Sequence, residues 1–326
     1  MKNNLFSYAT SELSQDAFIC YLFSFAFPEY ENNDTALATC AKELLGQMLK
    51  TDNYNGLKVT DIKRQYKRID ILVIVNNNTY IIIEDKTFTG QKKDQLKRYK
   101  KALKDEGINE ENIHCVFFKI VEQAFPEANV VNITRKDLLR LFNKYKSKNQ
   151  IYNDYKYYLE HIEKDVASFE HLPIGDWRKL TSHAYRGFFT HLVNKKIIDT
   201  SKEYGWNYVN NPAGGFWGLW WYYFSRDELN RIGLTKEYVD NLYLQIEDNR
   251  IAVKLSAEKS EDKNLTTDMR WKLYSFFSKT VEGFQKQTYR KGKFMTVGSI
   301  NYDMSNYREK IEIMENAFDI LKLTSL

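Results

Sequence analysis

The sequence predicts an α/β protein, in which a mixed sheet flanked by helices is followed by a smaller α+β accessory domain. Segments with the two-residue alternation of strands lie between segments with the helical repeat of apolar positions. The first half runs helix, three strands, helix, strand, strand, helix, so a hairpin precedes a βαβ-like crossover and the sheet holds antiparallel and parallel pairs. Segments that resemble connectors lie near residues 150–175. The region after them has its own order of helices and strands, which predicts domains 1–165 and 166–326.

The bulk composition is that of a folded globular protein. Of 326 residues, 43% are hydrophobic and 28% charged, and the net charge of +5 permits a nucleic-acid partner without arguing for one. No run of about 18 apolar residues is present, so no membrane span is expected. The N-terminus lacks the order of a secretory signal, and the three cysteines form no disulfide framework. We therefore expect a cytoplasmic protein without membrane contact.

Helix signals open the first domain. Residues 11–26 are expected to form a helix with Ser11 as its N-cap, and residues 36–49 a second helix. The apolar side chains of the first helix recur at helical spacing and are predicted to face the core: Leu13, Phe18, Tyr21, Leu22 and Phe25. A third helix is expected over residues 90–107, with Gly107 as its stop.

Strand signals lie on both sides of that third helix. Three strand candidates come before it and two after it: residues 58–66, 69–75, 79–85, 113–120 and 129–133. The next helix is expected to open with a capping box formed by Thr134 and Asp137. These elements complete the predicted sheet.

The second domain has a different pattern, without internal repeats. A helix over residues 177–194 is followed by an aromatic strand over residues 216–225. A hairpin over residues 242–257 turns on Asp248 and Asn249. A helix over residues 268–284, a strand over residues 294–302 and a last helix complete the chain.

Charged side chains gather at the open end of the first hairpin. Asp70 lies where one strand begins, and Glu84 and Lys86 lie where the next one finishes. Because side chains alternate faces, these three share one face while Asp85 points to the other. A three-residue turn centred on Asn77 pairs Asp70 with Glu84, which places their Cβ atoms about 4.5–5.5 Å apart. Two carboxylates so close repel unless a cation lies between them, and Mg²⁺ takes such oxygen ligands.

This inference depends on the length of the turn. A two-residue loop would shift the pairing by one residue and separate the two carboxylates, whereas a five-residue loop with the same centre would preserve it. Charged residues are also common at strand ends, where Lys86 would simply neutralise its neighbours. The order of Asp70, a spacing of fourteen positions and then Glu84-x-Lys86 favours the metal site.

In these residues the chain resembles the PD-(D/E)xK nuclease superfamily over residues 8–145, with Asp70 as the first acid and Glu84-x-Lys86 as the second half of the motif. Ile69 stands where the motif has proline, a position that binds no metal. The resemblance implies a restriction-endonuclease-like fold and cleavage of phosphodiester bonds.

More narrowly, the chain is similar to a bacterial branch in which a first-helix glutamate and Gln-x-x-x-Tyr accompany the motif. Here these residues are Glu12, Gln95 and Tyr99. The resemblance implies that Glu12 supplements the metal ligands, although a glutamate in a first helical turn also stabilises the helix dipole. It implies that Gln95 and Tyr99, one turn apart, overlook the active site; Tyr99 also fits the core stripe of its helix.

The expected site follows from these assignments. Its metal ligands are Asp70, Glu84, the backbone carbonyl of Asp85, and Glu12. Lys86 is expected to orient the attacking water and to offset charge in the transition state, with Gln95 and Tyr99 beside it. The cofactor is expected to be Mg²⁺, with Mn²⁺ as a substitute.

Two basic segments are candidates for nucleic-acid contact. The helix after the motif carries Lys92 and Lys93, although amphipathic helices ordinarily carry solvated lysines. A second segment mixes basic and aromatic side chains beside a glycine: Tyr289, Arg290, Lys291 and Lys293. The aromatic run with Trp217, Trp220 and Trp221 could stack bases, but core packing, or a dimer face, explains it as well.

The leading function is therefore a Mg²⁺-dependent endonuclease that acts on DNA, in a restriction or phage-defence setting that the resemblance alone implies. One rival is a catalytically silent or partner-regulated nucleic-acid-binding protein on the same fold, and another is an RNA nuclease. A homodimer or a regulatory protein partner is compatible with the sequence. Nucleotide-binding loops and serine hydrolase motifs are absent from the sequence.

Overall fold

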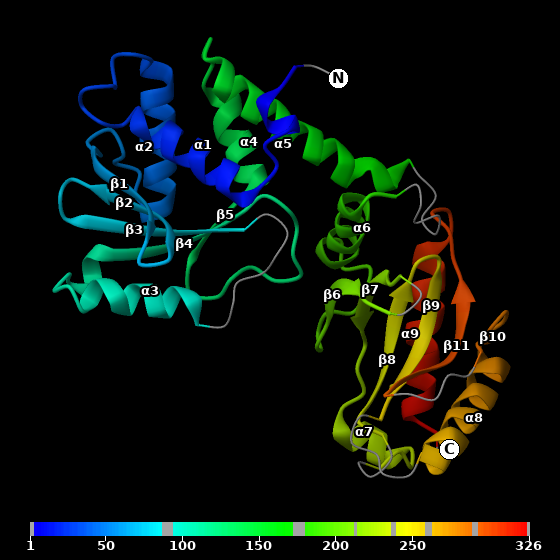
Figure 1. Cartoon of the computed structure of the whole chain (residues 1–326). Coiled ribbons are helices and arrows are strands. Elements are labelled where there is room, and N and C mark those ends of the chain that lie inside the picture. The colour runs from blue at the N-terminus through cyan, green and yellow to red at the C-terminus, as the bar shows by residue number, and fades with distance from the viewer. Residues whose placement is uncertain are drawn as a thin grey trace. The chain divides into compact units, whose positions relative to one another are not determined.

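The computed structural model describes residues 3–86, 94–171, 180–211, 214–235, 239–257, 263–288 and 293–324. The chain divides into two compact units, Met1–Lys164 and Asp165–Leu326 (Figure 1). The predicted boundary lies one residue later, and the roles assigned to the two domains stay predictions. Within the described part, no helix is both long enough and apolar enough to cross a membrane.

The first unit is built on a five-stranded sheet with strand order β1-β2-β3-β4-β5. Its strands are β1 (Val59–Tyr66), β2 (Ile69–Val75), β3 (Thr79–Lys86), β4 (Ile113–Lys119) and β5 (Val131–Thr134). The β1–β2 and β2–β3 pairs are antiparallel, whereas β3–β4 and β4–β5 are parallel. This mixed sheet confirms the predicted fold class and each predicted strand of the first domain.

The turn between β2 and β3 gives the hairpin its predicted register. Val75 pairs with Thr79 and Ile71 with Ile83, so three residues form the loop. Because side chains alternate along both strands, this register directs Asp70 and Glu84 toward one face at the same end of the hairpin.

Asparagines hold that turn in place. Asn76 and Asn77 have left-handed φ values of 52° and 64°, which asparagine adopts more readily than most residues. The N–H of Asn76 donates to the carbonyl of Lys58 at 2.9 Å, and its side-chain oxygen accepts from the N–H of Lys58 at 3.0 Å. The loop is therefore anchored to the residue that precedes β1.

Helices cover both faces of this sheet (Figure 1). They are α1 (Glu12–Ser24), α2 (Thr35–Leu49), α3 (Gln95–Lys104), α4 (Arg135–Lys144) and α5 (Gln150–Ala167), whose last three residues belong to the second unit; short 3₁₀ turns lie at Leu5–Ser7 and Glu110–Asn112. α1 packs on β1, β2 and β3, while α3 packs on β3 and β4 from the opposite face. Thr134 and Asp137 form the predicted capping box of α4.

One of these helices was missed, and one apolar side chain was misplaced. Residues 150–167, for which no element was predicted, form α5, whose Tyr152, Tyr155 and Leu159 are buried. In α1, Leu13 is 56% exposed instead of facing the core, because Gln15 and Asp16 occupy the buried side of the first turns. Polar groups of α1 therefore face the sheet.

The start of the predicted third helix, residues 90–93, lies outside the described residues. From Gln95 the helix is α3, and Gly107 follows its end with φ 85°. The apolar side chains of α3 pack on the sheet in one cluster: Ile69, Leu72, Ile82, Leu96, Tyr99, Leu103 and Ile113. The core stripe expected for Tyr99 is therefore present.

The second unit contains a six-stranded antiparallel sheet with strand order β10-β11-β9-β8-β7-β6. Its strands are β6 (Gly205–Val209), β7 (Phe216–Trp221), β8 (Asn241–Glu247), β9 (Arg250–Ser256), β10 (Gln285–Lys286) and β11 (Phe294–Asn301). The β8–β9 hairpin turns on Asp248 and Asn249 as predicted. β6 and β10 were not predicted, and β7 stops at Trp221 because Tyr222 takes φ 59°.

Among its described residues, this unit has a 3₁₀ turn at Ser168–Glu170 and the helices α6 (Ser182–Asn194), α7 (Arg226–Arg231), α8 (Lys263–Thr280) and α9 (Tyr307–Lys322). α6 begins later than predicted, because the side chain of Thr181 caps it by accepting from the N–H of Ala184 at 3.2 Å. α7 was not predicted. Trp217 and Trp221 are buried, which confirms core packing for these two members of the aromatic run.

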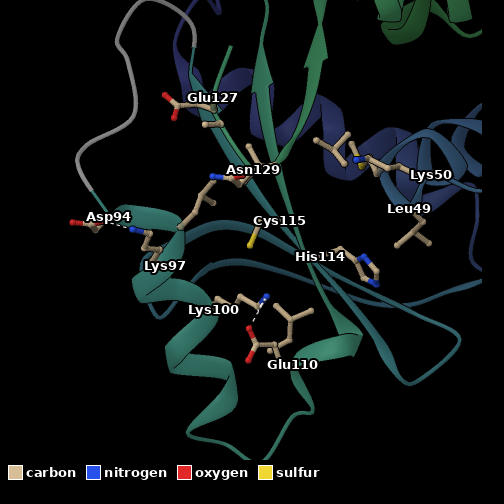
Figure 2. Close-up of a pocket in the computed structure, with 16 residues that line it drawn as sticks. Leu49, Lys50, Asp94, Lys97, Lys100, Glu110, His114, Cys115, Glu127 and Asn129 are labelled. Carbon is tan, nitrogen blue, oxygen red and sulfur yellow. Dashed lines mark ion pairs between the residues drawn. The ribbon is translucent and has the colours of Figure 1, made fainter. Parts of the chain in front are cut away.

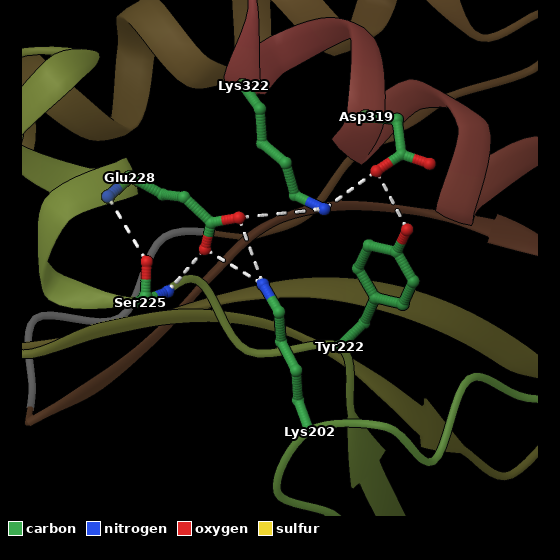
Figure 3. A network of polar contacts seen from close by, with 6 residues as sticks. All are labelled: Lys202, Tyr222, Ser225, Glu228, Asp319 and Lys322. Atoms are coloured by element: carbon green, nitrogen blue, oxygen red, sulfur yellow. Dashed lines mark hydrogen bonds and ion pairs between the residues drawn. The ribbon is translucent and has the colours of Figure 1, made fainter.

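A polar network ties three elements of the second unit together (Figure 3). Glu228 of α7 accepts hydrogen bonds from Lys202 at 2.8 and 3.0 Å, and Lys322 of α9 lies 3.9 Å from it. Lys322 also pairs with Asp319 at 2.7 Å, and Asp319 accepts from the hydroxyl of Tyr222 at 2.8 Å. These contacts hold α7 and α9 to the segment that leads into β6.

Candidate active site

The three motif side chains converge at one end of the β2–β3 hairpin. Asp70 is the second residue of β2, while Glu84 and Lys86 lie at the end of β3. The Lys86 Nζ atom lies 2.7 Å from Oε1 of Glu84 and 3.4 Å from Oδ2 of Asp70. The hairpin thus brings together the two carboxylates and the amine that the sequence predicted.

Two further oxygen groups surround the same ammonium. The carbonyl of Asp85 accepts a hydrogen bond from Lys86 Nζ at 2.8 Å. Glu12, the first residue of α1, places Oε2 3.7 Å from that nitrogen. All four predicted metal-ligand groups, from residues 12, 70, 84 and 85, therefore lie around one nitrogen atom.

Burial shapes the charge state of these groups. Burial, opposed by the Lys86 ammonium and reinforced by the charge of Asp70, raises the pKa of Glu84 from 4.5 to about 7. Burial alone would lower the pKa of Lys86, but its bond to Glu84 and the charges of Glu84, Asp70 and Glu12 raise that pKa above its ordinary value. The site holds a charged lysine among carboxylates that compete for positive charge.

Asp85 points to the opposite face of the sheet, as predicted from strand alternation. Its side chain is buried and accepts a short hydrogen bond from Nε2 of Gln15 on α1. Asp16 lies beside it, and burial followed by the charge of Asp70 raises the pKa of Asp16 from 3.8 to about 6. These two α1 residues were not predicted to belong to the site, because polar positions on a helix ordinarily face solvent.

Gln95 and Tyr99 lie on one face of α3, one turn apart. Nε2 of Gln95 donates to the hydroxyl of Tyr99 at 2.6 Å. Burial, together with the charges of Glu84 and Asp70, raises the pKa of Tyr99. The ring of Tyr99 therefore belongs to the core, while the charges of the motif carboxylates affect the pKa of its hydroxyl.

The donor set fits a hard divalent cation. Both oxygens of Glu84 are fully buried and, apart from the ion pair with Lys86, accept no hydrogen bond from the described residues. Buried carboxylate oxygens without donors are suited to a cation, and Mg²⁺ needs one or two carboxylates besides water. Among the described residues, no three acidic, histidine or cysteine side chains are already arranged as a metal cluster. The Lys86 ammonium occupies the centre of the group instead.

The predicted nucleic-acid contacts are largely outside the described residues, where Lys92, Lys93, Tyr289, Arg290 and Lys291 all lie. Lys293 is described and exposed, and its carbonyl accepts from the N–H of Ala257 at 2.8 Å. Its predicted contact with nucleic acid stays a prediction.

The structure also places a basic turn at the motif end of the sheet. The β1–β2 turn contains Lys67 and Arg68, with φ values of 52° and 71°, and is followed by Ile69 and then Asp70. Arg64, Lys67 and Arg68 are exposed, and Lys67 pairs with Glu106. This charged turn was not predicted, because the motif begins only at Asp70. The basic residues of the turn lie in the segment RQYKR, which precedes Asp70 in the sequence.

A groove of about 1010 Å³ lies away from the motif (Figure 2). His114 and Cys115, at the beginning of β4, are among its lining residues, and none of the three motif residues lines it. His114 and Cys115 pair with Ile81 and Ile82 of β3, so this wall of the groove lies before Glu84 along that strand. Two of its charged pairs are Lys100 with Glu110 and Lys97 with Asp94, each at 3.0 Å. The groove is therefore separate from the candidate active site.

Two carboxylates and a lysine at the end of a hairpin of a mixed α/β sheet are suited to metal-dependent hydrolysis. The comparison with protein families matches residues 4–174 to the PD-(D/E)XK nuclease superfamily. This match covers more than half of the chain, so the chain belongs to that superfamily, whose nucleases use divalent metal ions and act on nucleic acids. The comparisons with curated proteins and with solved structures found no match.

Proposed function

We propose that this protein is a Mg²⁺-dependent endonuclease that cleaves DNA. The observation that carries the proposal is the convergence of Asp70, Glu84 and Lys86, with the Lys86 nitrogen 3.4 and 2.7 Å from the two carboxylates. A restriction or phage-defence setting, a cytoplasmic location and a homodimer or regulatory partner stay expectations of the sequence.

Each residue has a role in this proposal. Asp70, Glu84 and the carbonyl of Asp85 would hold the metal ion, with Glu12 as an outer or second-metal ligand. When bound, Mg²⁺ or Mn²⁺ lowers the pKa of a water molecule and neutralises charge on phosphoryl oxygens. The Lys86 ammonium, held at the same place, orients the attacking water and stabilises the negative charge that develops in the transition state.

Charge supports a polyanionic substrate. Arg64, near the end of β1, and Arg68, in the β1–β2 turn, are exposed and lie at the same end of the sheet as Asp70. Basic side chains beside a phosphodiester-cleaving site contribute affinity for the phosphate backbone of either nucleic acid. DNA is favoured on the resemblance, and RNA is the alternative substrate that the assay must separate.

The test is digestion of a panel of single- and double-stranded DNA and RNA, each with Mg²⁺, Mn²⁺ or EDTA. We expect metal-dependent cleavage of DNA that falls at least ~100-fold in Asp70→Asn and in Glu84→Gln. Asp61→Asn is the matched control, because Asp61 on β1 is a partly exposed carboxylate paired with Lys63.

Each outcome has a clear meaning. Full cutting by Asp70→Asn and Glu84→Gln would overturn the site assignment, and preference for RNA would replace the substrate. Nucleic-acid binding without cleavage under any metal would favour the rival function, a binding protein that is silent or that waits for a partner.

A further inference from the structure

A buried chain of hydrogen bonds connects α5 through α1 to the end of β3. The hydroxyl of Tyr155 donates to Oε1 of Gln15 at 3.1 Å, and Nε2 of Gln15 donates to Oδ1 of Asp85. All three side chains are buried. Glutamine suits the middle position because its amide accepts with one atom and donates with the other.

We call the chain of hydrogen bonds from Tyr155 through Gln15 to Asp85 the relay. Aromatic packing fixes its first residue, Tyr155. The ring of Tyr155 stacks on Phe18 of α1, with centroids 3.7 Å apart and planes at 20°. Phe6 meets the same ring edge-on at 5.0 Å, and Phe142 of α4 lies at 6.4 Å. The hydroxyl therefore has one available direction, and Gln15 is held by a rigid donor.

The last residue of the relay presents its backbone to the active site. The N–H of Asp85 donates to Oδ2 of Asp70 at 3.2 Å, and its carbonyl accepts from Lys86 Nζ at 2.8 Å. Because the side chain of Asp85 points away from the site, the relay acts on these two backbone groups without contacting a substrate. The orientations of the two peptide planes that flank the Asp85 Cα atom are thus set from the opposite face of the sheet.

This part of β3 needs such support. The described pairing of β2 with β3 ends at Ile71 and Ile83, whereas β3 continues to Lys86 beside β4 only. Residues 84–86 therefore have backbone pairing on one edge, and the other edge is held by the contact of Asp85 with Asp70. An element held on one side can tilt unless side chains fix it.

We propose that Gln15 and Tyr155 are positioning residues, which hold the Asp85 backbone in the orientation that the metal-binding site requires. This inference rests on the proposed function, and it adds two residues, from α1 and α5, to the residues of the motif. Partners of metal ligands typically contribute ten- to hundredfold to metal affinity or activity.

The test compares a variant of Tyr155, which belongs to the relay, with a variant of Tyr152, which does not. Tyr155→Phe removes the hydroxyl and keeps the ring packing. Tyr152→Phe is the matched control, because Tyr152 is also buried on α5 and its hydroxyl donates to the carbonyls of Phe142 and Tyr145 at 3.2 and 3.1 Å. Both variants lose a buried hydroxyl, so both are expected to lose thermal stability to a similar extent.

We expect Tyr155→Phe to lower kcat about tenfold and to raise the Mg²⁺ concentration for half-maximal activity, with KM for the nucleic acid unchanged. Tyr152→Phe should stay within about twofold of wild type in all three quantities. Gln15→Leu should change the same quantities as Tyr155→Phe, with a larger effect. If Gln15→Leu fails to fold, the comparison of Tyr155→Phe with Tyr152→Phe still tests the inference.

Equal kinetics for the two tyrosine variants would overturn the inference. If the wild-type chain cleaves no substrate, the proposed function fails, and Mn²⁺ titration of the same variants still tests the relay. Weaker Mn²⁺ binding in Tyr155→Phe than in Tyr152→Phe would support the relay, and equal binding would reject it.

Discussion

The ammonium of Lys86 lies 2.7 Å from the carboxylate of Glu84, two residues back on the same face of β3. The two side chains neutralise each other in a buried place, and Asp70 is the next carboxylate at 3.4 Å. A metal ion and this ammonium would use the same oxygens, so the lysine is both a partner in catalysis and a competitor for the ligands.

That competition predicts opposite effects on binding and on cleavage. Lys86→Met should bind Mn²⁺ severalfold more tightly at pH 8.5, because the competing charge is gone, while cleavage falls at least ~100-fold. The measurements are calorimetric titration with Mn²⁺ and single-turnover cleavage. Lys63→Met, on the neighbouring strand β1, is the control; weaker Mn²⁺ binding in Lys86→Met would contradict the competition.

The raised pKa of Glu84 predicts a pH dependence of metal binding. Burial raises that pKa to about 7, and a metal ion needs the carboxylate, so the apparent Mn²⁺ affinity should fall about tenfold per pH unit below 7 and level off above 8. Titrations between pH 5.5 and 9 measure this slope. A flat profile across that range would show that Glu84 ionises at its ordinary pKa.

The same shift affects the metal-free fold with a definite sign. A carboxyl that keeps its proton to higher pH in the folded state favours folding while it is protonated. The contribution of Glu84 is therefore complete below pH 4.5 and lost as the pH rises through 7. Glu84→Gln should remove this part of the pH dependence of the free energy of unfolding.

The basic β1–β2 turn predicts an effect on substrate affinity alone. Arg68→Ala should raise KM severalfold at 0.1 M salt and reduce the slope of log affinity against log salt by about 1, with kcat unchanged. Fluorescence anisotropy across a salt series measures the slope. Arg140→Ala is the control, since Arg140 is an exposed arginine on α4 paired with Asp137; an equal effect there would mean unspecific charge.

The second unit has an acid-sensitive contact of its own. Although burial opposes it, the bonds of Glu228 to Lys202 and to Ser225 lower its pKa from 4.5 to about 2. Its stabilisation is therefore present above pH 4.5 and lost as the pH falls through 2. Glu228→Gln should lower the free energy of unfolding by about 1–2 kcal/mol at pH 7, and the difference should vanish toward pH 2.

Intrinsic fluorescence can follow this unit by itself, because all six tryptophans lie at or beyond residue 177. Glu309→Gln is the control, since Glu309 is 66% exposed and lies 3.6 Å from Lys310. A loss of stability in Glu228→Gln that persists unchanged at pH 2 would point to packing instead of charge.

Strand alternation made the motif predictable. A fixed period of two and a short turn determine which residues oppose one another, so the relation of Asp70, Glu84 and Lys86 followed from spacing alone. Local signals also sufficed for the capping box at Thr134 and the stop at Gly107.

The relay residues were beyond such reasoning. Gln15 meets Asp85 across 70 positions and Tyr155 across 140, and no local period encodes those contacts. α5 was missed although its buried side chains recur at helical spacing, because connector-like residues lie at both of its ends; the buried residues are Tyr152, Tyr155, Leu159, Ile162 and Val166. Leu13 was misplaced for the complementary reason, as an apolar residue in a turn whose buried side is polar.

The asparagine turn between β2 and β3 carries a consequence for engineering. Removing one of its three residues would force the hairpin to re-pair by a single step, and one acid of the pair would then face α1 while the other faced α3. Substitutions in this loop should be tolerated as long as the loop keeps an odd number of residues. A one-residue deletion there, although remote from the catalytic residues, should abolish activity as completely as the removal of a carboxylate.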